Sequence, residues 1–458
     1  MNIVIIGLAL FVLLNAIVAW TSRSAQTKEG FFVADRKSGM WSTAFSISAT
    51  FLYAFGVIMA SVFAYVKGWS GVAWLIIPNL IAVISVGYVG YQLSKGTVLK
   101  KGFNFTDVIK SKYDNKGLTW FYTIMYIISA IYAITANLTG FGIIADYLAP
   151  GLSYINVLIV MSLVVLAYTL VGGLKASIKT DMVQMALLLF VGIIGAMVVV
   201  SQVGGLGTVL DNWTTAKPTN LFDPKSMWIP GILLLALLPA SAMADNGLYQ
   251  RIYAMEDKTK LLRTFVLGGL IMVITMAGMG LMAGAIFSTE LSPSKPHLAG
   301  TMMMQTYGGT LFLLAFVVAF LCAAASTIDS ALNSAGSIVA NDILPGGDSV
   351  KTGRIVIAVI MLGSFILASL KIDLWVLITT FGVLRLTIIA PTLYTSIASK
   401  VTATDGKFIL AGLATDIVFL AMSKSKMIAL TGIQEAYTGA LIPLAFIVAS
   451  RIYQANKS

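Results

Sequence analysis

Long apolar runs alternate with short polar segments along this chain, and the length of the runs predicts helices that cross a membrane. A helix rises by about 1.5 Å per residue, so roughly 20 apolar residues cover the hydrocarbon core of a bilayer. The pattern predicts an all-α integral membrane protein with about 13 transmembrane helices. The predicted spans lie at about residues 2–20, 41–66, 70–94, 118–148, 152–171, 178–203, 228–248, 262–287, 309–340, 354–370, 374–397, 408–422 and 434–450.

The composition agrees with a membrane protein and excludes a soluble one. Hydrophobic residues make up 58% of the 458 residues and charged residues 11%, against about 45–50% and about 25% in an ordinary soluble domain. The mean hydropathy is +0.91. No loop between the predicted spans is long enough for a soluble domain. We therefore expect residues 1–458 to form a single membrane transport domain in contact with the lipid bilayer.

Basic residues are concentrated in alternate loops, and this predicts the orientation. If residue 1 is outside, the inner loops hold 22 of the 30 Lys and Arg, the outer loops hold 7, and Arg385 lies alone within a span. Positive charge favours the cytoplasmic side. We expect a multi-pass protein of the cell membrane with its N-terminus outside and its C-terminus in the cytoplasm. The same distribution accounts for the net charge of +11 without a nucleic-acid partner.

Residues that carry out covalent or metal catalysis are scarce in this chain. It has one cysteine, Cys322 inside a span, and one histidine, His297 in a loop. The first span has no Lys or Arg before it, so we expect it to remain as a helix and not to be cleaved as a signal peptide. Without a GxSxG motif or a glycine-rich phosphate loop, nucleophilic and zinc catalysis lack the residues they require. We expect neither an enzyme nor an organic cofactor.

A stripe of polar residues in the ninth predicted span indicates an ion site. In AAASTIDSALNS (323–334), a spacing of about 100° per residue puts Ser326, Thr327 and Ser330 on one arc with Asp329 at its edge. An acidic side chain at bilayer depth is costly, so Asp329 is expected to face a cavity, a partner or an ion. Oxygen ligands suit hard cations and favour Na⁺ or H⁺ over a transition metal. Close helix packing is the alternative explanation of the small residues.

A second acidic residue, Asp181, enters the sixth predicted span from GGLKASIKTDMVQM (172–185). An acidic side chain just inside a membrane is expected to have a partner. That partner is Lys175, Lys179 or a cation shared with Asp329, and the sequence leaves these possibilities open.

The second predicted span combines hydroxyl residues with a central glycine. The stretch WSTAFSISATFLYAFGVIMASVFAYVKGWSG (41–71) carries Ser and Thr at several positions before Gly56. These residues alone indicate little, because a hydroxyl can bond to a carbonyl of its own helix. Around a glycine in the middle of a membrane, they indicate a broken helix whose free backbone carbonyls line a site.

Four motifs, in this order, resemble those of the sodium:solute symporter family, which includes bacterial proline, sialic acid and sugar symporters. FFVADRKSG resembles the family's motif before the second span, and GGLKASIKTDMVQ resembles its GG-x-A-x-x-x-TD-x-x-Q signature. AAASTIDSALNSAGSIVANDI resembles the STxDS segment, and YQRIYA resembles the QR motif after the seventh span. The resemblance extends from about residue 30 to 400.

The resemblance implies the inverted five-plus-five helix (LeuT-type) fold. Residues 1–40 would form an extra helix and an inner loop, 41–203 the first repeat, 227–400 the second repeat, and 401–458 two C-terminal helices. The alternating basic loops are consistent with this division, because an odd number of helices in each repeat inverts the second repeat relative to the first.

The resemblance also implies sodium-binding residues. The family's main sodium site, carried over residue by residue, would use backbone carbonyls and two hydroxyls, from Ala49, Leu52, Ala323, Ser326 and Thr327, with Ser46 beside it. Some members bind a second cation between the sixth and ninth spans, which here would involve Asp181, Ser326, Asp329 and Ser330. Many relatives have a hydroxyl at the position of Asp329. The role of Asp329 is therefore left open: it binds a second Na⁺, carries a proton or pairs with a lysine.

Substrate residues are implied on the second, third and seventh spans, at Phe51, Tyr53, Gly56, Asn79, Ser241 and Asp245. Positions that contact sugars in sugar-transporting members are small or apolar here, as at Ser241 and Leu75, which argues against a sugar. SVFAYVKGWSG resembles the matching stretch of the urea-transporting branch. Arg385, in the eleventh span, is either a carboxylate-binding residue or a structural partner of the inner loops.

These observations predict a sodium-coupled secondary active symporter that imports a small polar organic solute by alternating access, with Na⁺ as its only metal. Na⁺ at Ser326 and Thr327 would tie the ninth span to the broken second span and so favour substrate binding. One alternative is proton coupling through Asp329 and Asp181. Another is a ligand sensor, which usually carries a cytoplasmic signalling domain, whereas this chain ends at RIYQANKS. The oligomeric state is open, and a monomer is compatible with the sequence.

Overall fold

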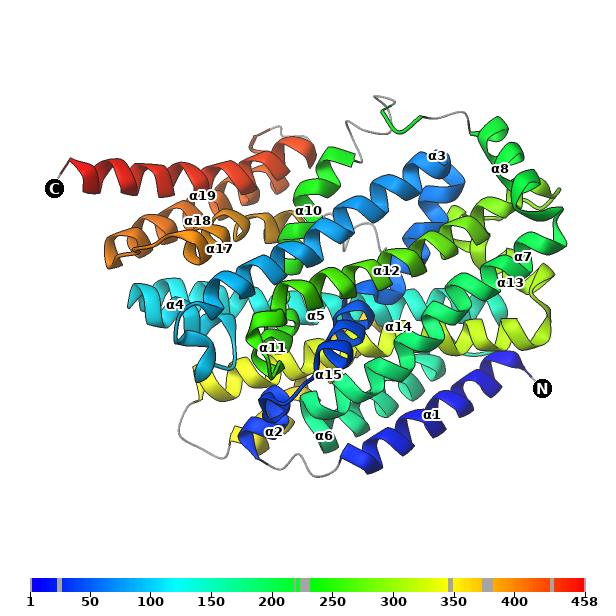
Figure 1. Ribbon diagram of the computed structural model, residues 1–458, viewed down its shortest axis with the longest axis horizontal. Coiled ribbons are helices and arrows are strands. Elements are labelled where there is room, and N and C mark those ends of the chain that lie inside the picture. Colours follow the sequence, from blue (N-terminus) through cyan, green and yellow to red (C-terminus); the bar gives the residue numbers. More distant parts are fainter. Residues whose placement is uncertain are drawn as a thin grey trace.

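Long apolar helices run through the whole of the computed structural model (Figure 1). The structure describes residues 2–22, 27–217, 220–222, 231–344, 349–372, 382–428 and 432–456. Within these ranges the only β-type pairing is an isolated bridge between Ser38 and Met255. Eight described helical segments are long and apolar enough to cross a membrane. The predicted all-α membrane class is therefore confirmed.

Two pairs of predicted spans are joined into continuous helical runs. Helix α3 (Met40–Ser94) contains the second and third predicted spans and is kinked at Gly68, where φ is 70°. Helix α6 (Tyr154–Phe190) is kinked at Gly173, where φ is 53°, and continues through a π-helical turn into α7 (Ala196–Gln202). Because of these mergers, the predicted count of 13 helices is not confirmed.

Other predicted spans correspond to single helices. They are α1 (Ile3–Ser22), α5 (Lys116–Leu148), α12 (Leu261–Gly284), α14 (Gly309–Ile338), α15 (Ser349–Ser369), α18 (Ala403–Lys424) and α19 (Gly432–Ala455). Residues 374–381 of the eleventh predicted span lie outside the described residues, and α17 (Ile389–Ile397) forms the end of that span. Segments predicted as loops contain the short helices α2 (Lys28–Val33), α4 (Phe105–Tyr113), α8 (Gly205–Ala216) and α13 (Ala299–Tyr307).

The seventh predicted span is broken in two, which the sequence pattern did not predict. Helix α10 (Ile232–Met243) ends before Asp245, whose side chain accepts a hydrogen bond from the backbone N–H of Gly247 at 2.8 Å. This N-cap starts helix α11 (Asn246–Ala254). The prediction of one helix over 228–248 with YQRIYA in a loop beyond it was wrong, because these residues form a fully buried helix. Residues 228–230 are not among those described.

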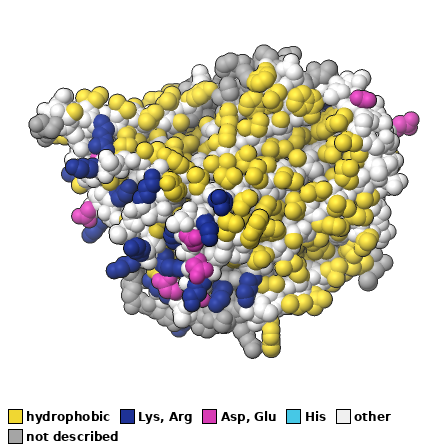
Figure 2. All heavy atoms as spheres, viewed as in Figure 1, with side chains coloured by type: hydrophobic (Ala, Val, Ile, Leu, Met, Phe, Trp, Pro, Cys, Tyr) yellow, Lys and Arg dark blue, Asp and Glu magenta, His cyan; other side chains and the backbone are white. Residues whose placement is uncertain are grey.

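The outer surface has the character of a protein that faces lipid. Ile355, Val359, Leu362 and Ile366 on one side of α15 are each more than half exposed. Figure 2 shows hydrophobic side chains over most of the visible face, with Lys and Arg gathered toward one end. In contrast, α14 is buried from Phe316 to its end, polar residues included. The polar stripe therefore faces protein and not lipid.

Backbones approach closely where α12 crosses the π-helical turn. A Cβ added to Gly278 would lie 1.7 Å from the carbonyl oxygen of Gly192, so the two segments would have to move apart. We expect Gly278→Ala to lower the stability by about 1–3 kcal/mol or more, as overpacking does. Gly363→Ala on α15 is the matched control, because nothing lies within 4 Å of its added Cβ, and alanine favours a helix over glycine. Equal thermal unfolding of both variants would contradict this close approach.

Candidate functional site

The first element of the site is the break in α3 at Tyr53, where φ is 55° and ψ is 146°. A helix that stops here leaves the carbonyls of its last turn, Ala49 to Leu52, without the amide donors of a following turn. On the other side of the break, the N–H of Ala54 donates to the side-chain oxygen of Asn137 at 2.8 Å. Asn137 lies on α5, so a neighbouring helix holds the break in place.

Helix α14 reaches the break through Thr327. Its hydroxyl donates to the carbonyl oxygen of Thr50 at 3.0 Å and also lies 3.3 Å from the carbonyl oxygen of Ala323. The Ser326 hydroxyl is buried and lies within reach of the Asp181 carboxylate, without a well-aligned hydrogen bond. The fold thus brings the predicted sodium-binding residues of α14 to the broken turn that contains Ala49 and Leu52, and all five residues are buried.

Arg251 on α11 lies at the centre of the neighbouring polar cluster and is completely buried. Its guanidinium pairs with the carboxylate of Asp181 at 3.0 Å. It also donates to the hydroxyls of Ser46 at 3.0 Å, Ser177 at 3.1 Å and Ser330 at 2.6 Å. One arginine therefore connects α3, α6 and α14 across the site.

Neither of the two lysines that the sequence left open as partners of Asp181 pairs with it. Lys175 forms an ion pair with Asp35 at 3.0 Å, and Lys179 donates to the carbonyl oxygen of Thr21 at 3.0 Å. Arg251 takes their place, because the YQRIYA segment folds back into the protein as α11. The sequence drew attention to this motif but did not assign the arginine a role.

Asp329 is bound by hydroxyl groups. Tyr168 donates to one carboxylate oxygen and Ser177 to the other, each at 2.6 Å, and Ser330 lies 3.1 Å from the latter oxygen. Among the described residues, no Lys or Arg forms an ion pair with Asp329. Ser177 accepts from Arg251 and donates to Asp329, so its hydroxyl connects the ion pair of Arg251 and Asp181 with Asp329.

Two buried oxygens in this region, Oγ of Ser326 and Oδ1 of Asp181, have no well-aligned hydrogen-bond partner, although the two side chains lie within reach of each other. Unpartnered buried polar atoms are rare in folded proteins, and a bound ion is one of the ways in which such atoms are satisfied. Hydroxyl, carbonyl and carboxylate oxygens are the donor set that a hard cation prefers. The residues present therefore fit Na⁺ as a transported ion.

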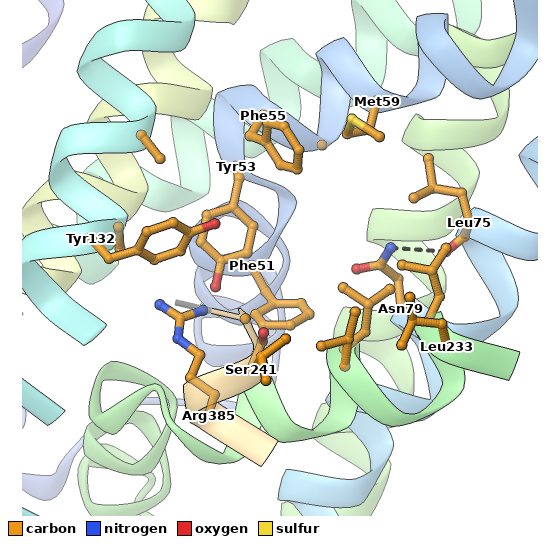
Figure 3. Close-up of a pocket in the computed structure, with 18 of the residues that line it drawn as sticks. Phe51, Tyr53, Phe55, Met59, Leu75, Asn79, Tyr132, Leu233, Ser241 and Arg385 are labelled. Atoms are coloured by element: carbon orange, nitrogen blue, oxygen red, sulfur yellow. Dashed lines mark hydrogen bonds between the residues drawn. The ribbon is translucent and has the colours of Figure 1, made fainter. Parts of the chain in front are cut away.

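A cavity of about 420 Å³ begins on the other side of the broken turn (Figure 3). Five of the six predicted substrate residues line it, namely Phe51, Tyr53, Gly56, Asn79 and Ser241. The sixth, Asp245, lies in a much smaller adjoining pocket together with Tyr53 and Arg385.

Leu52 connects the cavity with the ion-binding residues, because it belongs to the broken turn and also lines the cavity. Sequence analysis missed three residues that build the site: Arg251, Tyr168 and Asn137. Each contacts a segment distant in the chain. The YQRIYA motif was the signal for Arg251, and a polar residue in an apolar segment was the signal for Tyr168 and Asn137.

Comparisons with known proteins identify the family of the chain. The family described as Sodium:solute symporter family matches residues 31–404. The sodium/pantothenate symporter of Haemophilus influenzae is 24% identical over 350 residues, covering 73% of this chain and 70% of the relative. That of Escherichia coli is 24% identical over 272 residues, covering 56% and 53%.

A solved Na⁺-coupled sialic acid symporter, in a substrate-bound outward-open state, has the same fold. It superposes with a TM-score of 0.81 at 18% identity, over 98% of this chain and 97% of that chain. The family match covers most of the sequence, and three of the four motif segments, GGLKASIKTDMVQ, AAASTIDSALNSAGSIVANDI and YQRIYA, contribute residues to one buried polar cluster. The chain therefore belongs to the sodium:solute symporter family and is a sodium-coupled transporter of the cell membrane, not an enzyme.

Proposed function

We propose that this protein imports a small polar organic solute together with Na⁺ by alternating access. The observation that carries the proposal is the meeting of α14 with the break in α3, where the Thr327 hydroxyl lies 3.0 Å from the Thr50 carbonyl. Na⁺ would bind the carbonyls of Ala49, Leu52 and Ala323 and the hydroxyls of Ser326 and Thr327. Asp245, Ser241 and the residues of the broken turn would face the solute.

Coupling between ion and solute would pass through the broken turn. Na⁺ held by the Leu52 carbonyl would fix the backbone at Phe51 and Tyr53, whose side chains line the cavity. An ion that stabilises this conformation favours solute binding, and the solute favours ion binding by the same factor. Departure of Na⁺ to the cytoplasm would release the connection between α3 and α14.

The charge balance around Asp329 favours a second cation, Na⁺ or a proton, in the buried cluster. Among the described residues, the buried cluster contains two carboxylates, Asp181 and Asp329, and one positive side chain, Arg251. A second Na⁺ near Asp181, Asp329 and Ser330, or a proton on Asp329, would balance the remaining negative charge. Proton coupling is therefore the second candidate.

Charge distribution supports the proposed orientation. The two termini lie at opposite ends of the molecule, and the basic side chains in Figure 2 gather toward the end that contains α2, α4 and the C-terminus. Exposed lysines of this part of the chain include Lys28, Lys100, Lys101 and Lys110. Positive charge favours the cytoplasmic side, so we infer that the C-terminus is inside.

Uptake into proteoliposomes tests the proposed function. With a panel of labelled solutes that includes pantothenate, we expect accumulation under an inward Na⁺ gradient and an inside-negative potential. The potential contributes about 2.3 kcal/mol per charge per 100 mV. Replacement of Na⁺ by K⁺ should abolish accumulation. Uptake that ignores Na⁺ but follows an imposed pH gradient would contradict sodium coupling and support the proton alternative.

A further inference from the structure

We propose that Arg385 makes the cavity a binding site for a carboxylate, so that the solute is a small organic acid with a largely apolar body. This inference rests on the proposed function, because it takes the cavity as the substrate site. The sequence left the role of Arg385 open between carboxylate binding and a structural contact with the inner loops. Its position in the cavity wall argues against the loop contact.

The described hydrogen-bond and ring partners of the Arg385 guanidinium are neutral groups. Its Cζ lies 4.4 Å from the centre of the Tyr132 ring, and Nη2 donates to the carbonyl oxygen of Ser129 at 3.3 Å. Its Nε is buried without a hydrogen-bond partner, and the residue is 6% exposed. A charge at this depth is costly without a counter-ion. An anionic solute would supply one.

No described acidic residue forms an ion pair with Arg385, in a structure whose gaps include 373–381. Asp245 shares the smaller pocket with Arg385, but it forms no ion pair with it and caps α11 instead. At another part of the cavity wall, Lys424 and Glu435 pair with each other at 2.8 Å. The described charges that line the main cavity therefore sum to one positive charge, from Arg385, which the Asp245 carboxylate of the adjoining pocket attracts from beyond ion-pair distance.

The rest of the cavity suits an apolar body. Its walls include four leucines of α10 and four large side chains of α3, namely Leu233, Leu234, Leu237, Leu238, Phe51, Phe55, Met59 and Phe63. The two amide side chains in the wall already bond to the backbone. Asn137 accepts from the N–H of Ala54 and donates to the carbonyl of Ala133, and Asn79 donates to the carbonyl of Leu75. Few polar groups remain for a polyhydroxylated solute, whose buried hydroxyls would then lack partners.

The cavity has two chemically distinct sides. Figure 3 shows Tyr132, Tyr53 and Arg385 converging on one side of the cavity, while Leu75 and Leu233 lie on the other. A carboxylate at Arg385 would accept two parallel hydrogen bonds from the planar guanidinium. The organic body would then extend toward the leucines. The volume of about 420 Å³ is near the lower end of the roughly 300–1,000 Å³ range of ligand sites, which favours a small acid.

Thermal stabilisation of the purified protein in Na⁺ tests the inference with matched probes. Butyrate, hexanoate, lactate and benzoate would each be titrated against the corresponding amide. We expect at least one acid to stabilise the protein at a concentration about tenfold or more below that of its amide. Arg385→Gln should remove this preference, a loss of roughly 10- to 100-fold in affinity for the acid. Arg385→Lys should retain part of it, because the charge remains.

Arg354→Gln is the matched control. Arg354 also stacks on an aromatic ring, with its Cζ 5.4 Å from the centre of the Phe31 ring, but it does not line the cavity. This variant should keep the preference for acids. The inference is overturned if no acid is preferred over its amide, or if the preference survives in Arg385→Gln. Stabilisation by Na⁺ in the same samples would show that such a failure leaves the sodium site, and with it the proposed function, intact.

Discussion

Replacement of Arg251 by leucine is expected to lower the stability of the folded protein by about 3–5 kcal/mol and to abolish sodium-driven uptake. This is the typical cost of breaking a buried ion pair by removing one partner. Arg251 pairs with Asp181 and donates to hydroxyls on α3, α6 and α14. Without it, the carboxylate of Asp181 would be an uncompensated charge inside the membrane domain.

The double variant separates the charge effect from lost packing. Adding Asp181→Asn to Arg251→Leu should restore part of the stability, because it removes the unpaired charge. Lys179→Met is the control, since Lys179 makes its contact with the Thr21 carbonyl at an exposed position, where substitutions usually change stability by about 0.5 kcal/mol or less. Thermal unfolding of the four proteins measures these differences. If Arg251→Leu unfolds like Lys179→Met, the assigned role of Arg251 is wrong.

The second large effect is expected at the ion-binding hydroxyls. Ser326→Ala combined with Thr327→Val should raise the Na⁺ concentration for half-maximal uptake by roughly 10- to 100-fold, the range that loss of a hydrogen bond to a charged group produces. Valine keeps the shape of threonine, so the change removes oxygen ligands with little effect on volume. The protein should still reach the membrane.

Ser364→Ala on α15 is the control for this experiment. Its hydroxyl is also buried without a well-aligned hydrogen bond, but it lies on a helix outside the proposed sodium site. We expect its Na⁺ dependence to match that of the wild type. Unchanged Na⁺ activation in the Ser326 and Thr327 variant would reject the site assignment, whatever the effect on maximal rate.

Patterns within short stretches of the sequence predicted the helix positions, the polar stripe and the helix break, because these features depend on residues that are near each other in the chain. The length of apolar runs predicted the positions of α1, α5, α12 and α14, because a helix must be about 20 residues long to cross a bilayer. The polar stripe of α14 was visible at helical spacing. The break in α3 was predicted from hydroxyl residues around Gly56, and it occurs three residues earlier, at Tyr53.

Contacts between distant segments could not be predicted in the same way. Arg251 and Asp181 are 70 residues apart, and their pairing depends on how α11 packs against α6. The break at Asp245 was missed because the apolar run ILLLALLPASAM leads into it without interruption. The Asp–Asn pair that follows is a helix-start signal, and it indicates a break only once the burial of YQRIYA is known.

Sodium binding by the folded protein is tested by its thermal unfolding in Na⁺, K⁺ and choline at equal ionic strength, for the wild type and for Asp329→Asn. A ligand that binds only the folded protein raises its stability with concentration. We predict selective stabilisation of the wild type by Na⁺, with a partial loss in Asp329→Asn if that residue contributes to a second cation site. Identical unfolding of the wild type in all three salts would contradict the sodium site at Ser326 and Thr327.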